Sequence, residues 1–301
     1  MKIRVSSGTA MYIGLKKGKA LEVPTTAYLM IPGDVCRGGC VFCPQSKGKK
    51  EWLSRVSWPK FILKEVVEKI KTSDLERICL QSPDIPRYEK KIINTIKELK
   101  KAKKPVSISS PPLTNKTLRF IKNPVDHIGV GIDGATDEVR KNIKPNYNPK
   151  LFWDYLGRAK HIYGAENVTA HVIVGIGEDI EELASLIKKI DTLGCRISLF
   201  PYYSKEEGGP DLKYYRRAQL LVHMIKNDER IDTSLKTVKE NPENMIEDIE
   251  KGEIFLTNGC PSCNRPFYTT RPGKEHRNFP RLPSKKELEK IKKDLNITGG
   301  E

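Results

Sequence analysis

The chain has 301 residues, of which 38% are hydrophobic and 31% are charged. This length and composition suit a globular protein with one large domain or two small ones. No stretch approaches eighteen consecutive apolar residues, and the N-terminus lacks an apolar segment followed by a small-residue cleavage site. The sequence therefore predicts no membrane span and favours a cytoplasmic protein.

The net charge of +16 allows two interpretations. It indicates either an acidic partner, such as nucleic acid or an acidic carrier protein, or a lysine-rich surface that only faces water. The basic run at residues 100–104 ends a helical pattern, where cations complement the helix dipole. No aromatic residues interleave with this run, so nucleic acid is not favoured as a partner.

Short apolar runs alternate with amphipathic segments along the first two thirds of the chain. Helical spacing of apolar residues marks 89–99 and 179–193, and Thr136 is a candidate helix cap before Asp137 and Glu138. The predicted strands are 28–31, 77–81, 106–109, 128–132, 168–174 and 196–200.

Six successive strand–helix units predict parallel strands with right-handed crossovers. The expected fold class is α/β, a partial (β/α)6 TIM-like barrel with an N-terminal extension and a C-terminal tail. In such barrels the active site lies where the strands end. We expect an extension or hairpin over 1–24, the partial barrel over 25–210, and helices, a strand at 254–256 and a cysteine-containing tail over 211–301.

The first cysteine motif directly follows the first predicted strand. It reads Cys36-Arg-Gly-Gly-Cys40-Val-Phe-Cys43. Three thiolates on a tight loop can each bind one iron of a cubane cluster and leave the fourth iron open to a small molecule. A zinc site would require a fourth protein ligand and usually uses paired CxxC motifs. The spacing therefore predicts a [4Fe–4S] cluster.

This motif resembles the signature of the radical S-adenosylmethionine (SAM) superfamily, Cys-x3-Cys-x-aromatic-Cys, with Phe42 at the aromatic position near the adenine. The resemblance implies that the open iron chelates SAM. It also implies that one-electron reduction releases a 5′-deoxyadenosyl radical. It covers roughly residues 25–205.

The resemblance also implies SAM-binding positions at the ends of later strands. The second strand ends in Gln81-Ser82-Pro83, which departs from the family's Gly-Gly-Glu-like motif, so backbone carbonyls are expected to make that contact. Val174-Gly-Ile-Gly-Glu178 resembles the family's glycine motif beside adenine. The SAM-binding residues implied in this way are Phe42, Gln81, Ser82, Ser109, Asp133, Gly175, Gly177 and Pro201.

A second cysteine set lies outside this motif. Cys260 and Cys263 form a CxxC after the turn signal Asn258-Gly259. Such a pair fits a second iron–sulfur cluster, a structural zinc with two further ligands such as His276, or a redox dithiol. We favour a second [4Fe–4S] cluster.

Two cysteines lie in predicted strands. The two-residue period places Cys79 and Gln81 on the same face, so Cys79 points into the barrel and is a possible third ligand of the second cluster. A position of this kind also resembles the cluster cysteine in the second strand of biotin synthase, although Thr169 stands where that enzyme has another ligand. Cys195 begins its strand roughly 16 Å from the active end, which favours a structural role.

The tail sequence Cys260-Pro-Ser-Cys-Asn-Arg-Pro-Phe-Tyr268 resembles that of archaeal two-protein lipoyl synthases, often labelled biotin synthases, within the biotin and lipoyl synthase group. The resemblance implies a sulfurtransferase that inserts sulfur into an octanoyl chain, with the second cluster as sulfur donor. The substrate would lie between the two clusters, and the tail motif would close over the open end of the barrel. Candidate substrate or cluster contacts are Arg265, Tyr268 and Arg271.

The implied partners are an octanoylated lipoyl-domain or H-type carrier protein, a second radical SAM lipoyl synthase component, and an electron donor such as ferredoxin. Such carriers are usually acidic, which would give the net charge a steering role. Three alternatives remain: a biotin synthase acting on dethiobiotin, a radical SAM enzyme that modifies RNA, and a non-catalytic iron–sulfur scaffold.

Overall fold

The computed structural model describes residues 1–203, 209–270 and 274–297. Its central sheet has the strand order β10-β9-β8-β7-β6-β2-β1-β5, and the six strands from β2 to β10 pair in parallel. These six strands are β2 (Thr26–Met30), β6 (Arg77–Gln81), β7 (Val106–Ser109), β8 (Val125–Asp133), β9 (Val168–Val174) and β10 (Arg196–Pro201). The predicted α/β partial barrel is confirmed.

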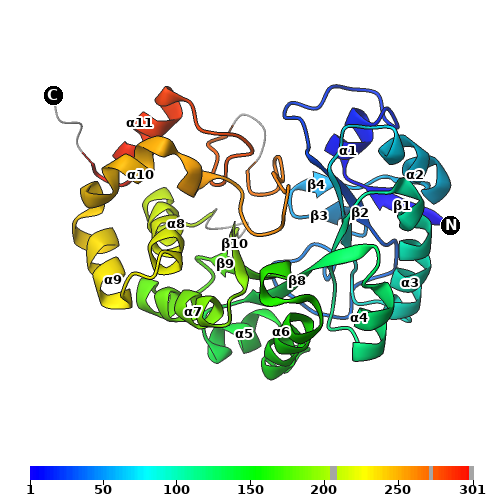
Figure 1. Cartoon of the computed structure of the whole chain (residues 1–301), viewed down its shortest axis with the longest axis horizontal. Coiled ribbons are helices and arrows are strands. Elements are labelled where there is room, and N and C mark those ends of the chain that lie inside the picture. The colour runs from blue at the N-terminus through cyan, green and yellow to red at the C-terminus, as the bar shows by residue number, and fades with distance from the viewer. Residues whose placement is uncertain (204–208, 271–273, 298–301) are drawn as a thin grey trace.

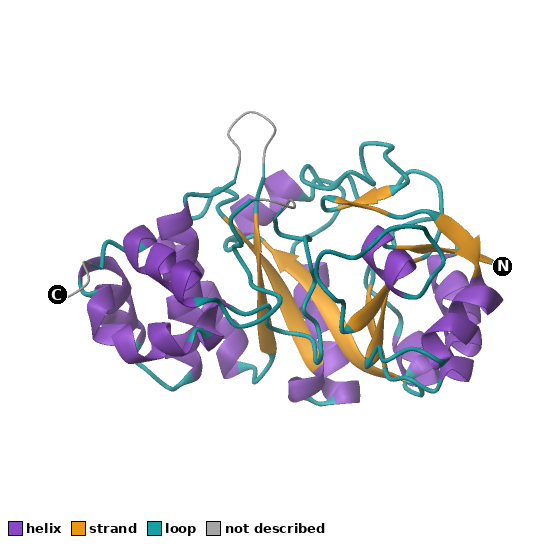
Figure 2. Cartoon of the chain, turned by 90° about the horizontal axis from the view of Figure 1, so that it is seen from above, coloured by secondary structure: helices purple, strands orange, loops and turns teal. Residues whose placement is uncertain are grey.

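Helices cross between the parallel strands and cover the outside of the curved sheet, as Figures 1 and 2 show. Helices α2, α3, α6 and α7 bury mainly apolar side chains. Thr136 caps α5 by accepting a hydrogen bond from the Val139 amide, as predicted. The helices of this layer are α2 (Leu63–Lys71), α3 (Tyr88–Leu99), α4 (Asn115–Ile121), α5 (Asp137–Ile143), α6 (Lys150–Tyr163) and α7 (Ile180–Thr192), with short 3-10 turns at Lys100–Ala102 and Ala165–Asn167.

The N-terminal extension joins the same sheet. Strand β1 (Lys2–Val5) pairs antiparallel with both β2 and β5 (Lys60–Ile62), and helix α1 (Ser7–Tyr12) connects β1 to the chain before β2. A small hairpin of β3 (Trp52–Leu53) and β4 (Val56–Ser57) follows the first cysteine motif. The extension therefore widens the sheet on the β2 side.

Helices dominate the chain after β10, as expected. They are α8 (Leu212–Lys226), α9 (Ile231–Glu240), α10 (Ile246–Lys251) and α11 (Lys285–Asp294), with a 3-10 turn at Pro242–Met245. The predicted strand at 254–256 is wrong. Glu253–Phe255 forms a 3-10 turn after Gly252, whose φ is 75°, and this turn buries Ile254 and Phe255 in the core. Only Leu256 makes an isolated bridge, to Phe279.

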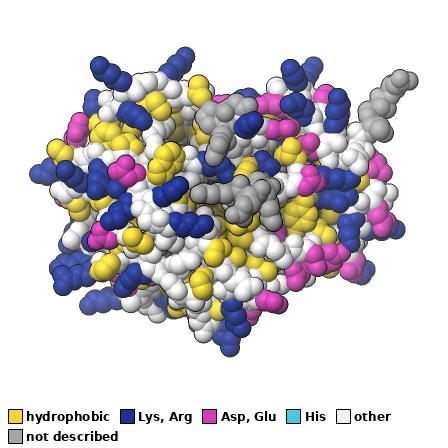
Figure 3. Space-filling view, turned by 180° about the vertical axis from the view of Figure 1, so that it is seen from behind, with side chains coloured by type: hydrophobic (Ala, Val, Ile, Leu, Met, Phe, Trp, Pro, Cys, Tyr) yellow, Lys and Arg dark blue, Asp and Glu magenta, His cyan; other side chains and the backbone are white. Residues whose placement is uncertain are grey.

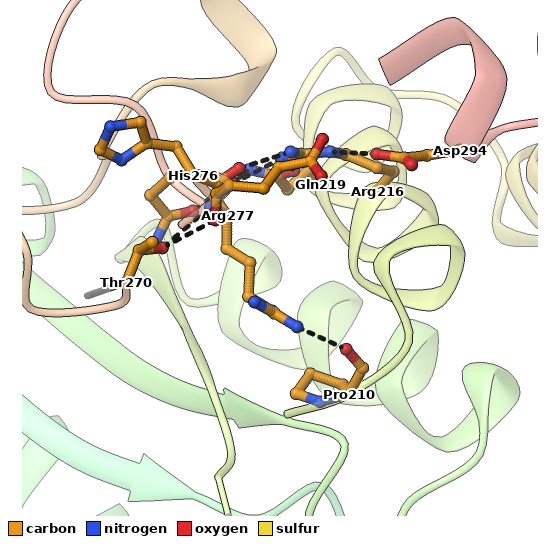
Figure 4. Close-up of polar contacts among 9 residues, drawn as sticks. Pro210, Arg216, Gln219, Thr270, His276, Arg277 and Asp294 are labelled. Atoms are coloured by element: carbon orange, nitrogen blue, oxygen red, sulfur yellow. Dashed lines mark hydrogen bonds and ion pairs between the residues drawn. The ribbon is translucent and has the colours of Figure 1, made fainter. Parts of the chain in front are cut away.

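A buried arginine anchors the tail to helix α8 (Figure 4). Arg216 is fully buried and donates hydrogen bonds to the carbonyls of Arg277 at 2.6 Å and His276 at 2.5 Å. Its Nε lies 3.7 Å from the Asp294 carboxylate of α11. One side chain therefore connects α8, the tail and the last helix.

Charged side chains cover much of the molecular surface. In the face shown in Figure 3, Lys and Arg side chains project around most of the margin, and Asp and Glu occur between them in smaller groups. The sequence has 54 basic residues and 38 acidic ones. On this face the basic side chains are spread out and do not form one patch. No helix within the described residues is long and apolar enough to cross a membrane.

Candidate functional site

The loop after β2 carries Cys36, Cys40 and Cys43, all of them half-buried. It is held from both sides of the barrel mouth. The Asp84 amide donates to the Cys36 sulfur at 3.2 Å, and the Val41 amide donates to the carbonyl of Ile143 at 3.0 Å. The three thiols are thus fixed at the carboxyl end of the strands, where the sequence predicts the active site.

Two glycines allow this loop to pass close to its neighbours. Gly39 has φ of +65°, and a Cβ on it would lie 2.6 Å from the Asn146 side chain. A Cβ on Gly38 would lie 3.0 Å from the Tyr147 ring, whose hydroxyl donates to Asp84 at 2.6 Å. Side chains at either glycine would push the loop off this support.

Burial dominates the electrostatics of the Cys40 and Cys43 thiols. It raises the pKa of Cys40 to about 12 and raises the pKa of Cys43 as well. The nearby Lys144 ammonium acts against burial at Cys40. Lys144 is itself buried and pairs with Asp133 at 2.6 Å. A bound cation would therefore favour the thiolate form of Cys40 and Cys43, as iron does for its ligands.

A cavity of about 200 Å³ adjoins these thiols. Gln81, Ser82, Ser109 and Asp133 line it at the ends of β6, β7 and β8, together with Phe42. Five of the predicted SAM-binding residues therefore share one cavity with the three cysteines.

The other three predicted positions lie elsewhere. Pro201 lines a neighbouring cavity. Among the described lining residues of the two cavities, Gly175 and Gly177 do not occur. The Gly175 amide instead donates to the Glu178 carboxylate at 2.5 Å, so the glycine motif forms a turn around that side chain.

The second cavity, of about 310 Å³, lies deeper in the barrel. Cys79, Cys260 and Cys263 all line it. Phe42, Leu53, Gln81, Asp133 and His171 line both cavities. The two sets of cysteines therefore face one continuous interior.

Polar side chains contact each of the three deeper thiols. The Gln81 amide donates to Cys79 at 3.0 Å, which confirms that both face the barrel interior. The Tyr28 hydroxyl lies 3.6 Å from the Cys263 sulfur, and His171 Nε2 lies 3.9 Å from the Cys260 sulfur. Burial raises the pKa of Cys79 and, to about 12, that of Cys260.

Arg265 supplies a buried positive charge to this cavity. It is 7% exposed, and its guanidinium lies 4.0 Å from the centre of the Phe200 ring. Its Nε and Nη2 have no hydrogen-bond partner among the described residues, and its charge lowers the pKa of both Cys79 and Cys260 against burial. A buried cation without a partner is costly, so the cavity is suited to an anionic group.

The tail loop closes the barrel at the end where the strands begin, opposite the first cysteine loop. The hydroxyls of Thr25 and Thr26 donate to the Ser262 carbonyl at 2.5 and 2.7 Å. Ser198 donates to the Asn258 carbonyl at 2.8 Å. Cys260 and Cys263 thus reach the interior from the end where the strands begin.

Of the remaining predicted residues that the structure describes, one lines the deeper cavity and two do not. Cys195 is 3% exposed and packs in the main hydrophobic core, away from both cavities. His276 contacts the Phe267 and Phe279 rings and does not line the cavity of Cys260 within the described residues. Tyr268 lines the deeper cavity, and Arg271 lies outside the described residues.

Two site residues were not found from the sequence. His171 follows Thr169 by two positions on β9, so the strand period points it into the barrel, where burial lowers its pKa to about 3 and keeps it neutral. Lys144 follows α5, and no sequence pattern marks it as a site residue, because its contact with Asp133 depends on how the chain after the helix returns to the strand ends.

The donor sets fit clusters better than single ions. No group of three His, Cys, Asp or Glu side chains in 1–203, 209–270 or 274–297 converges tightly enough to hold one metal ion. In a cubane each thiolate binds its own iron, so the ligands stand apart around a larger body. Cys36, Cys40 and Cys43 around a cavity match that requirement. Among the described residues no third His, Cys, Asp or Glu converges on Cys260 and Cys263 closely enough for a structural zinc.

This geometry, with a three-cysteine loop at the carboxyl end of a partial α/β barrel, fits an iron–sulfur protein. The chain belongs to the Radical SAM superfamily, whose family model matches residues 30–190, more than half of its length. It is therefore a radical SAM enzyme, and the family implies a [4Fe–4S] cluster with SAM. No curated protein matches the sequence as a relative.

Solved structures resemble the fold. Methylornithine synthase (PylB) has a TM-score of 0.53 and 14% identity over 96% of this chain and 84% of that one. HydG, a maturase of the [FeFe]-hydrogenase, has a TM-score of 0.53 and 12% identity over 90% and 81%. HydG from Carboxydothermus hydrogenoformans has a TM-score of 0.52 and 16% identity over 71% of this chain and 56% of that one. At these identities the likeness concerns the fold alone.

Proposed function

We propose that this radical SAM enzyme inserts sulfur into unactivated C–H bonds of a protein-bound octanoyl chain, as one component of a two-protein lipoyl synthase. The observation that carries the proposal is the deeper cavity. Cys79 from the barrel and Cys260 and Cys263 from the tail face it together, and it is continuous with the cavity at the first cysteine loop.

A second [4Fe–4S] cluster in this cavity is part of the proposal. Cys79, Cys260 and Cys263 would hold it, and Arg265 would balance its negative charge. When bound, the two clusters would supply the electron that cleaves SAM and the sulfide that is transferred. The buried, unpartnered nitrogens of Arg265 support this assignment, because an anionic body beside them removes an uncompensated charge.

The protein's own side chains would position the substrate between the two sets of cysteines. Gln81, Asp133 and His171 line both cavities, so an acyl chain lodged there would pass beside them. Phe200 and Ile173 add apolar surface. Such a lining would exclude water and hold the chain's C–H bonds in place, which is what a reactive radical requires.

The partners belong to the same proposal. An octanoylated lipoyl-domain or H-type carrier is usually acidic and would be attracted by the net charge of +16. A second radical SAM component would perform the other sulfur insertion, and an electron donor such as ferredoxin would reduce the first cluster.

The experiment combines iron counting with isotope transfer. Anaerobically reconstituted wild type should hold about eight irons per chain, as two four-iron clusters. With a deuterated octanoyl-lysine peptide, and with a candidate partner protein present, it should pass deuterium to 5′-deoxyadenosine and yield a thiolated product. Cys260→Ala/Cys263→Ala should hold about four irons and still pass deuterium, but add no sulfur.

The matched control is Cys195→Ala, which removes a buried thiol that faces neither cavity. It should keep both the iron content and the sulfur transfer. If deuterium never reaches 5′-deoxyadenosine from the octanoyl chain, with or without partners, the lipoyl proposal fails.

Dethiobiotin is the second candidate substrate. A cavity of about 310 Å³ is of the size that holds small molecules. Arg265 Nε and Nη2, which have no hydrogen-bond partner among the described residues, could bind the dethiobiotin carboxylate instead of a cluster. The same isotope assay with deuterated dethiobiotin decides between the two substrates.

A further inference from the structure

Both ends of the barrel interior are occupied by the chain itself. The loop of Cys36–Cys43 lies at the carboxyl end of the strands, and the tail loop is hydrogen-bonded to Thr25 and Thr26 at the other end. A path through the side of the barrel would lead a substrate directly between these two loops.

A groove of about 310 Å³ lies at that side. The N-terminal extension, the β3–β4 hairpin and the tail form its walls. Its lining is mainly apolar and includes Met11, Leu21, Pro24, Val56, Pro266 and Phe267. Two large apolar side chains of the lining are open to solvent, Leu21 at 71% and Trp52 at 45% exposure. Exposed apolar surface of this kind in a groove indicates a binding site.

The groove reaches the deeper cavity at its inner end. Tyr28 and Tyr268 line both the groove and the cavity that holds Cys79 and Cys263. Their ring centres are 5.1 Å apart, and Arg55 also lines both spaces, so these three side chains lie between the groove and the cysteines. An apolar chain in the groove is thus directed toward the proposed second cluster.

Lysines outnumber acidic residues at the outer rim of the groove, where the one carboxylate of the lining, Glu22, lies 3.9 Å from Arg281. Lys19 lines it, and Lys16 and Lys17 precede it on the same exposed loop. Within 1–203, 209–270 and 274–297 these three lysines take part in no ion pair; Lys16 only donates to the Ser7 hydroxyl, at 3.2 Å. Their charges are therefore available to an acidic surface.

We propose that this groove receives the acyl-lysine arm of an acidic carrier domain, which docks on Lys16, Lys17 and Lys19. The apolar lining binds the octanoyl chain, and the chain enters the interior past Tyr28 and Tyr268. This inference rests on the proposed function and adds to it the surface by which the carrier is recognised.

Gly8 offers a direct test of the groove. It lies in α1, lines the groove, and a Cβ on it would meet no atom within 4 Å. Gly8→Ala, Gly8→Leu and Gly8→Phe therefore fill the groove in steps without backbone strain. Gly157 in α6 has the same open surroundings but lies in another part of the fold, so Gly157→Phe is the matched control.

Binding is measured by equilibrium dialysis on the full, anaerobically reconstituted chain, with an octanoyl-lysine peptide and an acetyl-lysine peptide as probes. We expect Gly8→Ala to bind the octanoyl peptide nearly as wild type does, and Gly8→Phe to bind it about tenfold more weakly. Gly157→Phe should bind as wild type, and the acetyl peptide should not distinguish the variants.

The carrier surface is tested by charge reversal. Lys16→Glu/Lys17→Glu/Lys19→Glu should weaken binding of an octanoylated acidic carrier domain about tenfold at low salt, and leave the bare peptide unaffected. The control Lys286→Glu/Lys290→Glu/Lys293→Glu makes the same change in net charge on α11, which contributes no residue to the lining of the groove.

The outcomes separate the two proposals. If wild type binds the octanoyl peptide but Gly8→Phe binds it equally well, the groove is not the site and the proposed function stands. If the two charge reversals weaken carrier binding equally, the lysine rim is not the docking surface. If wild type binds no octanoyl peptide, the proposed substrate is wrong and this inference fails with it.

Discussion

Arg216 makes the strongest prediction about what holds the tail in place. Arg216→Met removes the donor to the His276 carbonyl and to the Gln219 side-chain oxygen. The Arg277 carbonyl loses one of its two donors and keeps the Gln219 amide. It also removes the cation beside Asp294. These groups connect the tail to α8 (Figure 4), so their loss acts first on the segment that carries Cys260 and Cys263.

The magnitude follows from what remains unpaired. A buried acceptor without a donor costs about 1–3 kcal/mol, and breaking a buried ion pair costs about 3–5 kcal/mol. Burial lowers the pKa of Arg216 to about 10 and raises that of Asp294, so the pair does not fully offset its own desolvation. We therefore expect a loss of about 3–5 kcal/mol in the free energy of unfolding, and about half of the ion-pair share to return in Arg216→Met/Asp294→Leu.

The assay is thermal unfolding of the metal-free chain, together with iron content after anaerobic reconstitution. The melting temperature should fall by on the order of 10 °C. Iron should fall from about eight toward about four per chain, while SAM cleavage persists. Arg217→Met, which removes one hydrogen bond to the Lys239 carbonyl, is the control and should cost about 1 kcal/mol. A melting temperature of Arg216→Met equal to that of this control would refute the reasoning.

Three further predictions concern the site and its surroundings. Cys40→Ala, like the same change at either partner cysteine, should abolish 5′-deoxyadenosine formation after reduction with SAM, and full activity would contradict the cluster assignment. Lys144→Met leaves Asp133 buried without its partner at 2.6 Å, so the dissociation constant of SAM in dialysis should rise about tenfold, and Lys144→Arg should restore part of the affinity. Burial lowers the pKa of His127 from 6.5 to about 4, so the unfolded chain takes up its proton first as the pH falls below 6.5. The free energy of unfolding of the wild type should therefore drop by about 3 kcal/mol between pH 7 and 4. That of His127→Gln should drop less over the same range. Equal pH dependence in the two proteins would contradict this prediction.

The barrel could be predicted from the sequence because local patterns define it. Strands β6, β7 and β9 have the predicted bounds, since short apolar runs between amphipathic helices leave few other arrangements. The period of two also placed Cys79 beside Gln81. The same two-residue period, counted from Thr169, would have predicted that His171 faces the interior.

The tail could not be predicted in this way. The position of Cys260 and Cys263 depends on contacts between the two ends of the chain, such as the Asn264 amide donating to the Val23 carbonyl at 2.8 Å. No sequence period encodes such contacts. The false strand at 254–256 has a related cause, because an apolar run gives the same signal whether it forms a strand or a buried 3-10 turn.

The division of cysteines between barrel and tail has a consequence for biosynthesis. All ligands of the first cluster lie on one short loop, whose barrel supports are complete once residue 201 has been made. Cys260 and Cys263 emerge from the ribosome later, and they reach the interior only when the tail folds back onto Thr25 and Thr26. A nascent chain can therefore form the loop of the first cluster while the end of its barrel where the strands begin is still uncovered. That end is covered only after the tail has been made.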